Sequence, residues 1–149
     1  MPFDFQIAVD ASAPHELADW WAETLGWVVE PTDEAFIRRM IAEGYASEDE
    51  TITHNGALAW RDGAAIRHPD APTGLARPRM LFQLVPENKI VPKTKNKLHL
   101  DLRVGAEDVD AVVARLKERG AKFLWNGQQG PHTWVTMADP EGNEFCVSE

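Results

Sequence analysis

The sequence predicts a mixed α+β fold built from two similar halves, and three observations support this prediction. The chain has 149 residues and a mass of 16.7 kDa, the size of one compact domain. Apolar and polar residues alternate in several short segments, as in half-buried strands, while other segments have apolar residues at helical spacing. The order strand, helix, several strands occurs twice, about 90 residues apart, which indicates a paired architecture rather than a solenoid.

The first half begins with an alternating segment and a helix that has clear end signals. Pro14 is a first-turn proline and Gly26 stands where a helix ends. Adjacent helical positions differ by about 100°, so Trp20 and Trp21 are not both expected to face the core: one is expected under the sheet and the other at a subunit interface. Asp62-Gly63 is the strongest short hairpin signal in the chain, and residues 45–55 fit no single element. The predicted elements are strand 3–10, helix 14–25, strand 27–30, helix 34–43, and strands 57–61, 64–68 and 80–85.

The second half repeats this order after a basic connecting loop at residues 89–96. Its predicted elements are strand 97–104, helix 106–119, and strands 121–125, 133–138 and 143–148. The domain prediction is therefore a single domain, 1–149, with module one at about 1–88, the linker at 89–96 and module two at 97–149. If the helices cover the apolar faces of the strands, we expect the polar faces of the two modules to meet and enclose a pocket.

Composition excludes several classes of protein. The formal net charge of -9 disfavours nucleic acid as a partner and favours a cationic small molecule if the charge lines a cavity. The single cysteine, Cys146, excludes an internal disulfide framework and a Cys-rich zinc module. The sequence has neither an apolar run long enough to cross a membrane nor the pattern of a secretory signal, so the expected location is the cytoplasm.

Common catalytic motifs are also missing. The sequence has no phosphate-binding glycine loop, no dinucleotide fingerprint and no nucleophile elbow. The segment beginning His15-Glu16 starts like a metalloprotease motif, but Asp19 stands where the second histidine is required. We therefore expect His15 and Glu16 to be ordinary surface residues of the first helical turn.

Candidate site residues lie on the polar faces of the predicted strands. Each also has a structural interpretation: His99 as a core histidine, Cys146 as a small buried hydrophobe, Glu144 as a solvated strand residue, and the glutamines as structural bridges. Among the six tryptophans, Trp60 and Trp134 are candidates for a ligand-stacking wall, although core filling is the commoner use. The polar-face candidates are Gln6, Gln83, His99, Asp101, Glu144 and Cys146.

Three segments together resemble a known family. Residues 97–104 read Lys-Leu-His-Leu-Asp-Leu-Arg-Val before a helix, residues 139–145 read Asp-Pro-Glu-Gly-Asn-Glu-Phe, and residues 21–27 read Trp-Ala-Glu-Thr-Leu-Gly-Trp. In this order they resemble the glyoxalase-like branch of the vicinal oxygen chelate superfamily. The resemblance implies two βαβββ modules whose curled sheets form a cleft, assembly as dimers, and a mononuclear metal bound by the first and fourth strand of each module.

The residues at the metal positions of that family are mostly replaced. Gln6 and Gln83 fall at the first-module positions, His99 matches the second-module histidine, and Cys146 stands where a carboxylate is usual. Glu144 lies on the same face as Cys146, about 7 Å away along the strand. Amides bind hard cations weakly, so we expect no tight hard metal; zinc on His99 and Cys146 is the remaining metal alternative.

These observations lead to one functional hypothesis and two alternatives. The first is a glyoxalase-like homodimer that binds a small organic molecule in the inter-module cleft without the usual metal, possessing lyase or isomerase activity if His99 acts as acid or base. Gln6, Gln83 and Glu144 would then orient the substrate. The first alternative is a non-catalytic, drug-sequestering protein similar to bleomycin-resistance proteins. The second alternative is a zinc-dependent enzyme.

Overall fold

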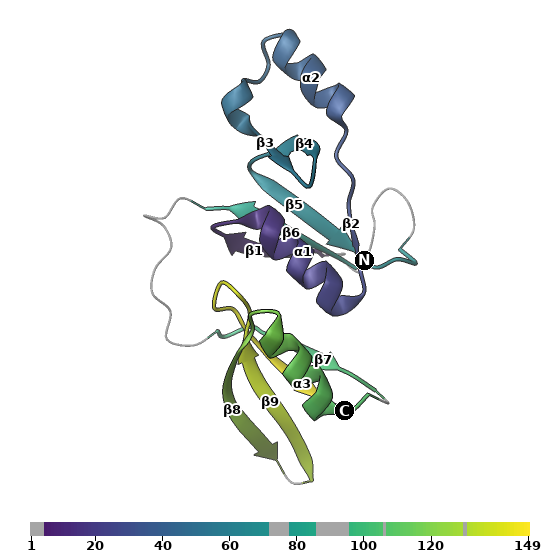
Figure 1. Ribbon diagram of the computed structural model, residues 1–149, viewed down its shortest axis with the longest axis vertical. Coiled ribbons are helices and arrows are strands. Elements are labelled where there is room, and N and C mark those ends of the chain that lie inside the picture. The colour runs from purple at the N-terminus through teal and green to yellow at the C-terminus, as the bar shows by residue number, and fades with distance from the viewer. Residues whose placement is uncertain (1–4, 72–77, 86–95, 106, 130) are drawn as a thin grey trace. The chain divides into compact units, whose positions relative to one another are not determined.

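The computed structural model describes residues 5–71, 78–85, 96–105, 107–129 and 131–149. The chain divides into two compact units, Met1–Ile90 and Val91–Glu149 (Figure 1). Lys89, Lys93 and Lys95 of the predicted linker, the start of the strand predicted at 3–10 and the first residue of the helix predicted at 106–119 lie outside the described residues.

The first unit has a four-stranded sheet with the strand order β1-β6-β5-β2. The first strand and the last strand of the unit run parallel and side by side, whereas the other neighbours are antiparallel. The sheet consists of β1 (Ile7–Ala11), β2 (Val28–Val29), β5 (Gly63–Arg67) and β6 (Arg79–Leu84). Helix α1 (Pro14–Leu25) packs on β5 and β6, so the buried Phe82 lies in the core of this unit (Figure 1).

Helix α1 has the bounds that the sequence predicts. Pro14 occupies its first turn, and Gly26 ends it with a φ of 67°, a left-handed conformation that glycine adopts without a steric penalty. The expectation that only one of Trp20 and Trp21 faces the core is wrong. Both side chains are buried, and their rings make an edge-to-face contact with centroids 5.0 Å apart. Large indoles reach the core from positions on the flank of a helix, so adjacent tryptophans can share one core.

An insertion separates β2 from β5. It contains α2 (Glu34–Ala42), the 3-10 helix η1 (Glu48–Glu50), β3 (Thr51–His54) and β4 (Ala57–Trp60). The Asp33 side chain accepts a hydrogen bond from the Phe36 backbone N–H and so caps α2, while Ile37 is the residue of this helix that is buried. The polar stretch 45–55, which fits no single element in the sequence, thus supplies η1 and the first strand of a hairpin.

The predicted hairpin at Asp62-Gly63 is wrong. Strand β4 pairs with β3, and β5 pairs with β6 and β2, so 57–61 and 64–68 are not hairpin partners. The hairpin turn lies instead at Asn55-Gly56, where both residues have positive φ, 51° and 79°. A two-residue turn of this kind needs positive φ at both central residues to match the twist of its strands, and Asn-Gly adopts this conformation readily.

The second unit has the same topology as the first. Its sheet has the order β7-β10-β9-β8, again with the first and last strands parallel. The elements are β7 (Leu100–Arg103), α3 (Val109–Glu118), β8 (Lys122–Gln129), β9 (His132–Ala138) and β10 (Glu144–Ser148). Strand β7 is shorter than the predicted 97–104, and Leu98 is 89% exposed. The two βαβββ modules predicted from the sequence are therefore present, and the first carries the insertion.

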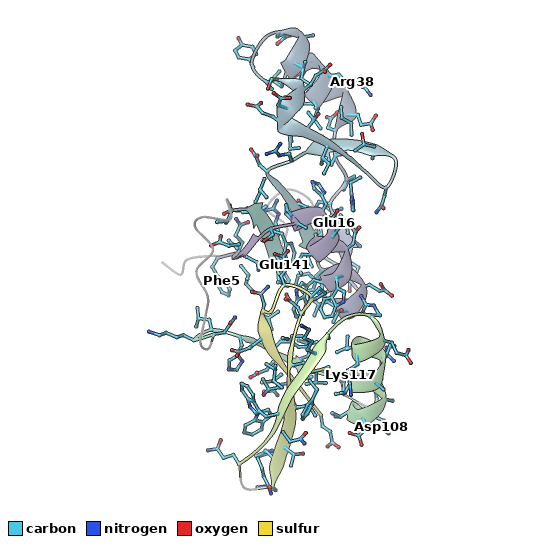
Figure 2. All side chains as sticks on the ribbon, turned by 60° about the vertical axis from the view of Figure 1, so that its left-hand side comes forward. Phe5, Glu16, Arg38, Asp108, Lys117 and Glu141 are labelled. Atoms are coloured by element: carbon cyan, nitrogen blue, oxygen red, sulfur yellow. The ribbon has the colours of Figure 1, made fainter. Side chains whose placement is uncertain are left out.

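The two faces of the second sheet differ in character. Helix α3 covers one face, where Val112 and Leu116 are buried together with Met137, Phe145 and Val147 of the sheet (Figure 1). Asp108 and Lys117 mark the two ends of this helix in Figure 2. The Asp108 side chain caps the positive end and basic residues lie in the last turn, an arrangement that complements the helix dipole. The opposite face carries the polar residues of β7 and β10.

None of the helices in the described part of the chain is both long and apolar enough to cross a membrane.

Candidate functional site

The densest group of chemically reactive side chains in the second unit is His99, Asp101 and Cys146. Nδ1 of His99 lies 3.2 Å from Oδ1 of Asp101. The ligand atoms of His99, Asp101 and Cys146 all lie within 4.8 Å of one another. The His99 side chain is 35% exposed and that of Asp101 is 62% exposed, so both are open to small molecules. We call these three residues the β7–β10 cluster.

The β7–β10 cluster follows from strand register. Strands β7 and β10 are parallel, and Cys146 pairs with Asp101. His99 precedes Asp101 by two residues, and alternation places both side chains on the same face. On the other side of β10, Thr136 pairs with Cys146, and its Oγ1 lies 3.4 Å from Sγ. The structure therefore brings His99 and Cys146 together as the sequence suggests, and adds Asp101 and Thr136 as their neighbours.

Glu144 belongs to a different local arrangement. The side chain is buried, with 7% of the residue exposed, and Oε2 accepts a hydrogen bond of 2.6 Å from the Asn96 backbone N–H. A buried carboxylate that accepts a short backbone hydrogen bond tethers a chain segment and has one fewer lone pair for a ligand. The proposed role of Glu144 in orienting a substrate stays a prediction, and its most evident role here is to hold the segment that leads into β7.

Gln6 lies next to a cation. Arg79 donates from Nη1 to Oε1 of Gln6 at 2.6 Å, and its Nε and Nη2 donate to the two carboxylate oxygens of Glu30 at 2.8 and 3.0 Å. The hydrogen bonds that Arg79 donates to Glu30 raise the pKa of Arg79 above its ordinary value, against the opposing effect of burial. The guanidinium is thus a fixed positive charge at the first-strand position.

Gln83 lies elsewhere on the same sheet. It is exposed on β6 and pairs with Asp10 of β1 on one side and Gly63 of β5 on the other. Gln6 stands four residues before Asp10, so Gln6 and Gln83 are not opposite each other in the register. Their predicted part in binding a ligand is not decided by this placement.

The first unit does not suit a hard divalent cation at the positions expected from the resemblance. The side-chain oxygen of Gln6 already accepts a hydrogen bond from the Arg79 guanidinium, which competes with a metal ion for that oxygen. Gln83 offers a neutral amide, which is a weak ligand for such ions. The β7–β10 cluster is different, because imidazole nitrogen, carboxylate oxygen and thiolate sulfur are all good zinc ligands.

A cleft of about 520 Å³ lies within the first unit. Small-molecule sites have volumes of about 300–1,000 Å³, so this cleft is large enough for one. Its walls include Trp60, together with apolar residues such as Val29 and Leu81. It also contains His15, which the sequence analysis placed on the surface. That expectation is wrong: His15 is 6% exposed and its Nε2 donates to the Trp60 carbonyl oxygen at 2.8 Å, whereas Glu16 is exposed (Figure 2).

Trp134 lines a second cleft of about 710 Å³, in the second unit. It pairs with Gly127 across β8 and β9, and a Cβ added to Gly127 would lie only 2.1 Å from the indole. The missing side chain of Gly127 thus makes room for the ring. Trp60 and Trp134 each line a cleft, and whether either stacks on a ligand remains a prediction.

Sequence reasoning missed the partners that fix the polar side chains. The Glu30–Arg79 pair joins residues 49 positions apart, and the contact of His54 with Asp19 joins residues 35 apart. One usable signal was available: His15 and Asp19 are spaced i and i+4, which places them on one face of α1. Their shared face turns toward the hairpin rather than toward solvent.

One comparison with known proteins identifies a family, and another finds solved structures that share the fold. The model of a family described as glyoxalase-like domain matches residues 6–148. No curated protein matches the chain in sequence. Solved structures that share the fold include a member of the glyoxalase/bleomycin resistance protein/dioxygenase superfamily from Sphaerobacter thermophilus, with a TM-score of 0.56, 16% identity, and coverage of 100% of this chain and 98% of that chain.

Two further structures extend the likeness. A glyoxalase family protein from Bacillus cereus has a TM-score of 0.57 and 14% identity, with 98% of this chain and 92% of that chain covered. A bleomycin-binding protein from Streptomyces verticillus, complexed with copper(II)-bleomycin, has a TM-score of 0.50 and 14% identity, with 99% of this chain and 96% of that chain covered. At these identities the likeness shows the fold alone.

Proposed function

Because the chain belongs to the glyoxalase-like domain family, we propose that it binds a small organic molecule and acts on it by proton transfer at His99. The reaction class is that of an isomerase or a lyase. In an isomerase, a base removes a proton from carbon and an acid returns one at another atom; in a lyase, loss of the proton is followed by departure of a leaving group from the neighbouring atom. The usual hard divalent metal takes no part in this proposal, since the first unit offers amides and a guanidinium where its ligands would be.

The observation that carries this proposal is the contact between His99 and Asp101. A carboxylate 3.2 Å from Nδ1 favours the tautomer with the proton on Nδ1, which leaves the Nε2 lone pair available as a base. His99 is partly exposed, so a substrate can reach it.

Other residues then have supporting roles. Cys146 lies beside His99 and offers a bound substrate either a weak S–H hydrogen-bond donor or an apolar contact. Gln6 and Gln83 belong to the first unit, and their role in orienting a substrate is a separate prediction, in which Gln6 would act together with Arg79. Trp60 and Trp134 line clefts whose walls do not include His99, so their stacking on a ligand is a separate prediction.

The test uses exchange of carbon-bound hydrogen. The protein is incubated in D2O with a panel of carbonyl compounds, and loss of the proton signal next to the carbonyl is followed by NMR. We expect at least one compound to exchange with the native chain, and His99→Asn to lower the rate by about 100-fold or more. His132→Asn, on the exposed start of β9, is the matched control and should exchange normally. Exchange that persists in His99→Asn would refute the proton-transfer role.

Binding without chemistry is the second candidate. The bleomycin-binding protein shares the fold, and the net charge of -9 favours a cationic ligand of that kind. Calorimetry with a cationic glycopeptide at two salt concentrations tests this candidate. It predicts heat of binding that weakens at the higher salt concentration, and absence of heat at low salt would eliminate it.

A zinc ion on the β7–β10 cluster is the third candidate. The three donors within 4.8 Å would supply three of the four ligands that zinc takes, and a bound zinc would polarise a substrate oxygen or lower the pKa of a bound water. Elemental analysis of chain purified without chelator should then find about one zinc per chain. Cys146→Ser should remove most of it, and full occupancy in that variant would contradict the assignment.

Assembly and location belong to the same proposal. We propose a cytoplasmic homodimer with no nucleic-acid partner, on the grounds of the acidic balance and the dimers implied by the family resemblance. Light scattering of the purified chain measures the mass directly, and a monomeric mass at all concentrations would contradict the dimer.

A further inference from the structure

The unit-one cleft contains a pair of histidines that the proposed function does not use. His15 on α1 and His54 at the end of β3 both line the cleft, and their ring centroids lie 5.1 Å apart with an angle of 38° between the planes. Asp19 also lines it, one helical turn after His15. These residues come from α1 and from the insertion, not from the strands that carry the β7–β10 cluster.

The hydrogen bonds fix the tautomer of each ring. A carbonyl oxygen only accepts, so the 2.8 Å contact with the Trp60 carbonyl requires that Nε2 of His15 carry the proton. Nε2 of His54 lies 2.5 Å from Oδ2 of Asp19, and Asn55 donates to the same oxygen at 3.1 Å. An ionised carboxylate oxygen only accepts hydrogen bonds, so Nε2 of His54 carries a proton and donates it to Asp19.

In its neutral form, each ring therefore has its lone pair on Nδ1. Neither Nδ1 has a hydrogen-bond partner among the described residues, and neither belongs to the fully buried, unpartnered polar atoms found there. Both nitrogens thus remain accessible within a cleft, although the His15 residue as a whole is only 6% exposed. Each ring is thus held through Nε2, while its Nδ1 is open to a ligand in the cleft.

The second bonds of the two rings match a known arrangement around metals. A histidine that binds a metal through one nitrogen almost always donates its other N–H to a carboxylate or a backbone carbonyl, which sets the tautomer and orients the ring. His54 has the carboxylate of Asp19 in this position, and His15 has the carbonyl of Trp60. The outer partners of a two-histidine site are thus already in place.

The charges of the cleft also favour a cation. Three carboxylates line it, those of Asp19, Glu30 and Asp33, against the single guanidinium of Arg79. Both oxygens of Glu30 are hydrogen-bonded to Arg79, which offsets that positive charge. The remaining field attracts a positive ion toward the two imidazoles.

We propose that His15 and His54 form a second site, which binds a divalent transition-metal ion such as Zn²⁺, Ni²⁺ or Cu²⁺ through their Nδ1 atoms. Imidazole nitrogen suits these metals and does not suit Mg²⁺ or Ca²⁺. Two protein ligands leave the other coordination positions to water or to a small molecule in the cleft. The site is independent of the proton-transfer proposal, since it uses none of the residues of the β7–β10 cluster.

The test titrates the metal alone into the chain by calorimetry, in a Cys146→Ser background that removes the thiol of the other candidate site. We expect one Ni²⁺ or Zn²⁺ per chain, and a loss of affinity of about 10-fold or more in His54→Asn and in His15→Asn. Asp19→Asn keeps both ligands but loses the carboxylate, and should weaken binding by about 10- to 100-fold. His132→Asn is the control with an exposed histidine and should bind as the parent does.

Two further measurements make the outcome decisive. The electron paramagnetic resonance spectrum of bound Cu²⁺ should show coupling to two imidazole nitrogens in the parent and to one in His54→Asn. Because His15 is buried, its variant could unfold; the His54 side chain is 18% exposed, so His54→Asn decides in that case, with circular dichroism to verify its fold. Unchanged affinity in His54→Asn, or no binding by the parent, would overturn the proposal.

Discussion

Arg79 shows how a single side chain determines the chemistry of a surface. Its three donors saturate both oxygens of Glu30 and the oxygen of Gln6, so three polar groups become one hydrogen-bonded unit. The side chains of Arg79 and Glu30 are only 27% and 24% exposed, and water replaces these bonds poorly when one partner is lost. Gln6, one member of this unit, stands at a position where the family resemblance implies a metal ligand.

Replacing Arg79 should therefore destabilise the fold. We expect Arg79→Met to lower the free energy of unfolding by about 1–3 kcal/mol, because Glu30 is left half-buried without its donors. Arg115→Met is the matched control: Arg115 pairs with Glu107 at 3.0 Å, but both side chains are more than half exposed, so the loss should be under about 0.5 kcal/mol. Urea denaturation of both variants measures the difference, and equal losses would show that the Arg79 contacts contribute nothing special.

The sequence predicts which site residues share one face of a strand, but it does not predict their hydrogen-bond partners. Alternation along a strand places His99 with Asp101, and Glu144 with Cys146, without any tertiary information. The hydrogen bond from Asn96 to Glu144 and the one from Arg79 to Gln6 depend on register between segments 48 and 73 residues apart, which no local pattern encodes. The burial of His15 is unpredictable for the same reason, since it depends on the β3–β4 hairpin, which lies 36 or more residues further along the chain.

At the scale of elements, the β3–β4 hairpin is the feature that most affects the site. It provides His54 and Trp60, two of the residues that line the unit-one cleft. Its turn at Asn55-Gly56 has both residues at positive φ. Helices 14–25 and 34–43 were predictable because their caps and apolar spacing are local. The hairpin was not, because Asp62-Gly63 also has the sequence of a hairpin turn, and only the pairing of β5 with β6 shows that no hairpin forms there.

The turn glycine provides a prediction for this element. Gly56→Ala forces an L residue into a left-handed conformation, so we expect the free energy of unfolding to fall by about 1–2 kcal/mol. Asp62→Ala, at the turn that the sequence suggested, should change it by less than about 0.5 kcal/mol, since Asp62 is exposed and has no positive φ. A larger loss for Asp62→Ala than for Gly56→Ala would contradict the assignment of the turn.

At the scale of the whole chain, the main feature is one topology used twice. Both units place their first strand parallel to their last, and both cover one sheet face with a helix. The repeat was readable from the sequence because each copy has the same order of alternating and helical segments. The chemistry is not repeated: the first unit has the Arg79 group and the histidine pair, and the second has the β7–β10 cluster. A shared fold with unlike sites is common among superfamilies.

The central claim is that a small molecule binds the polar face of the second sheet at His99. The most direct measurement is a map of backbone amide chemical shifts during titration. The titrant is a compound that the chain binds or whose carbon-bound hydrogen the chain exchanges. We predict that the shifts concentrate at the end of β7 and along β10, near residues 99–101 and 144–146, and that they disappear in His99→Asn. Shifts confined to the face covered by α3, or shifts that are the same in His99→Asn, would contradict the claim.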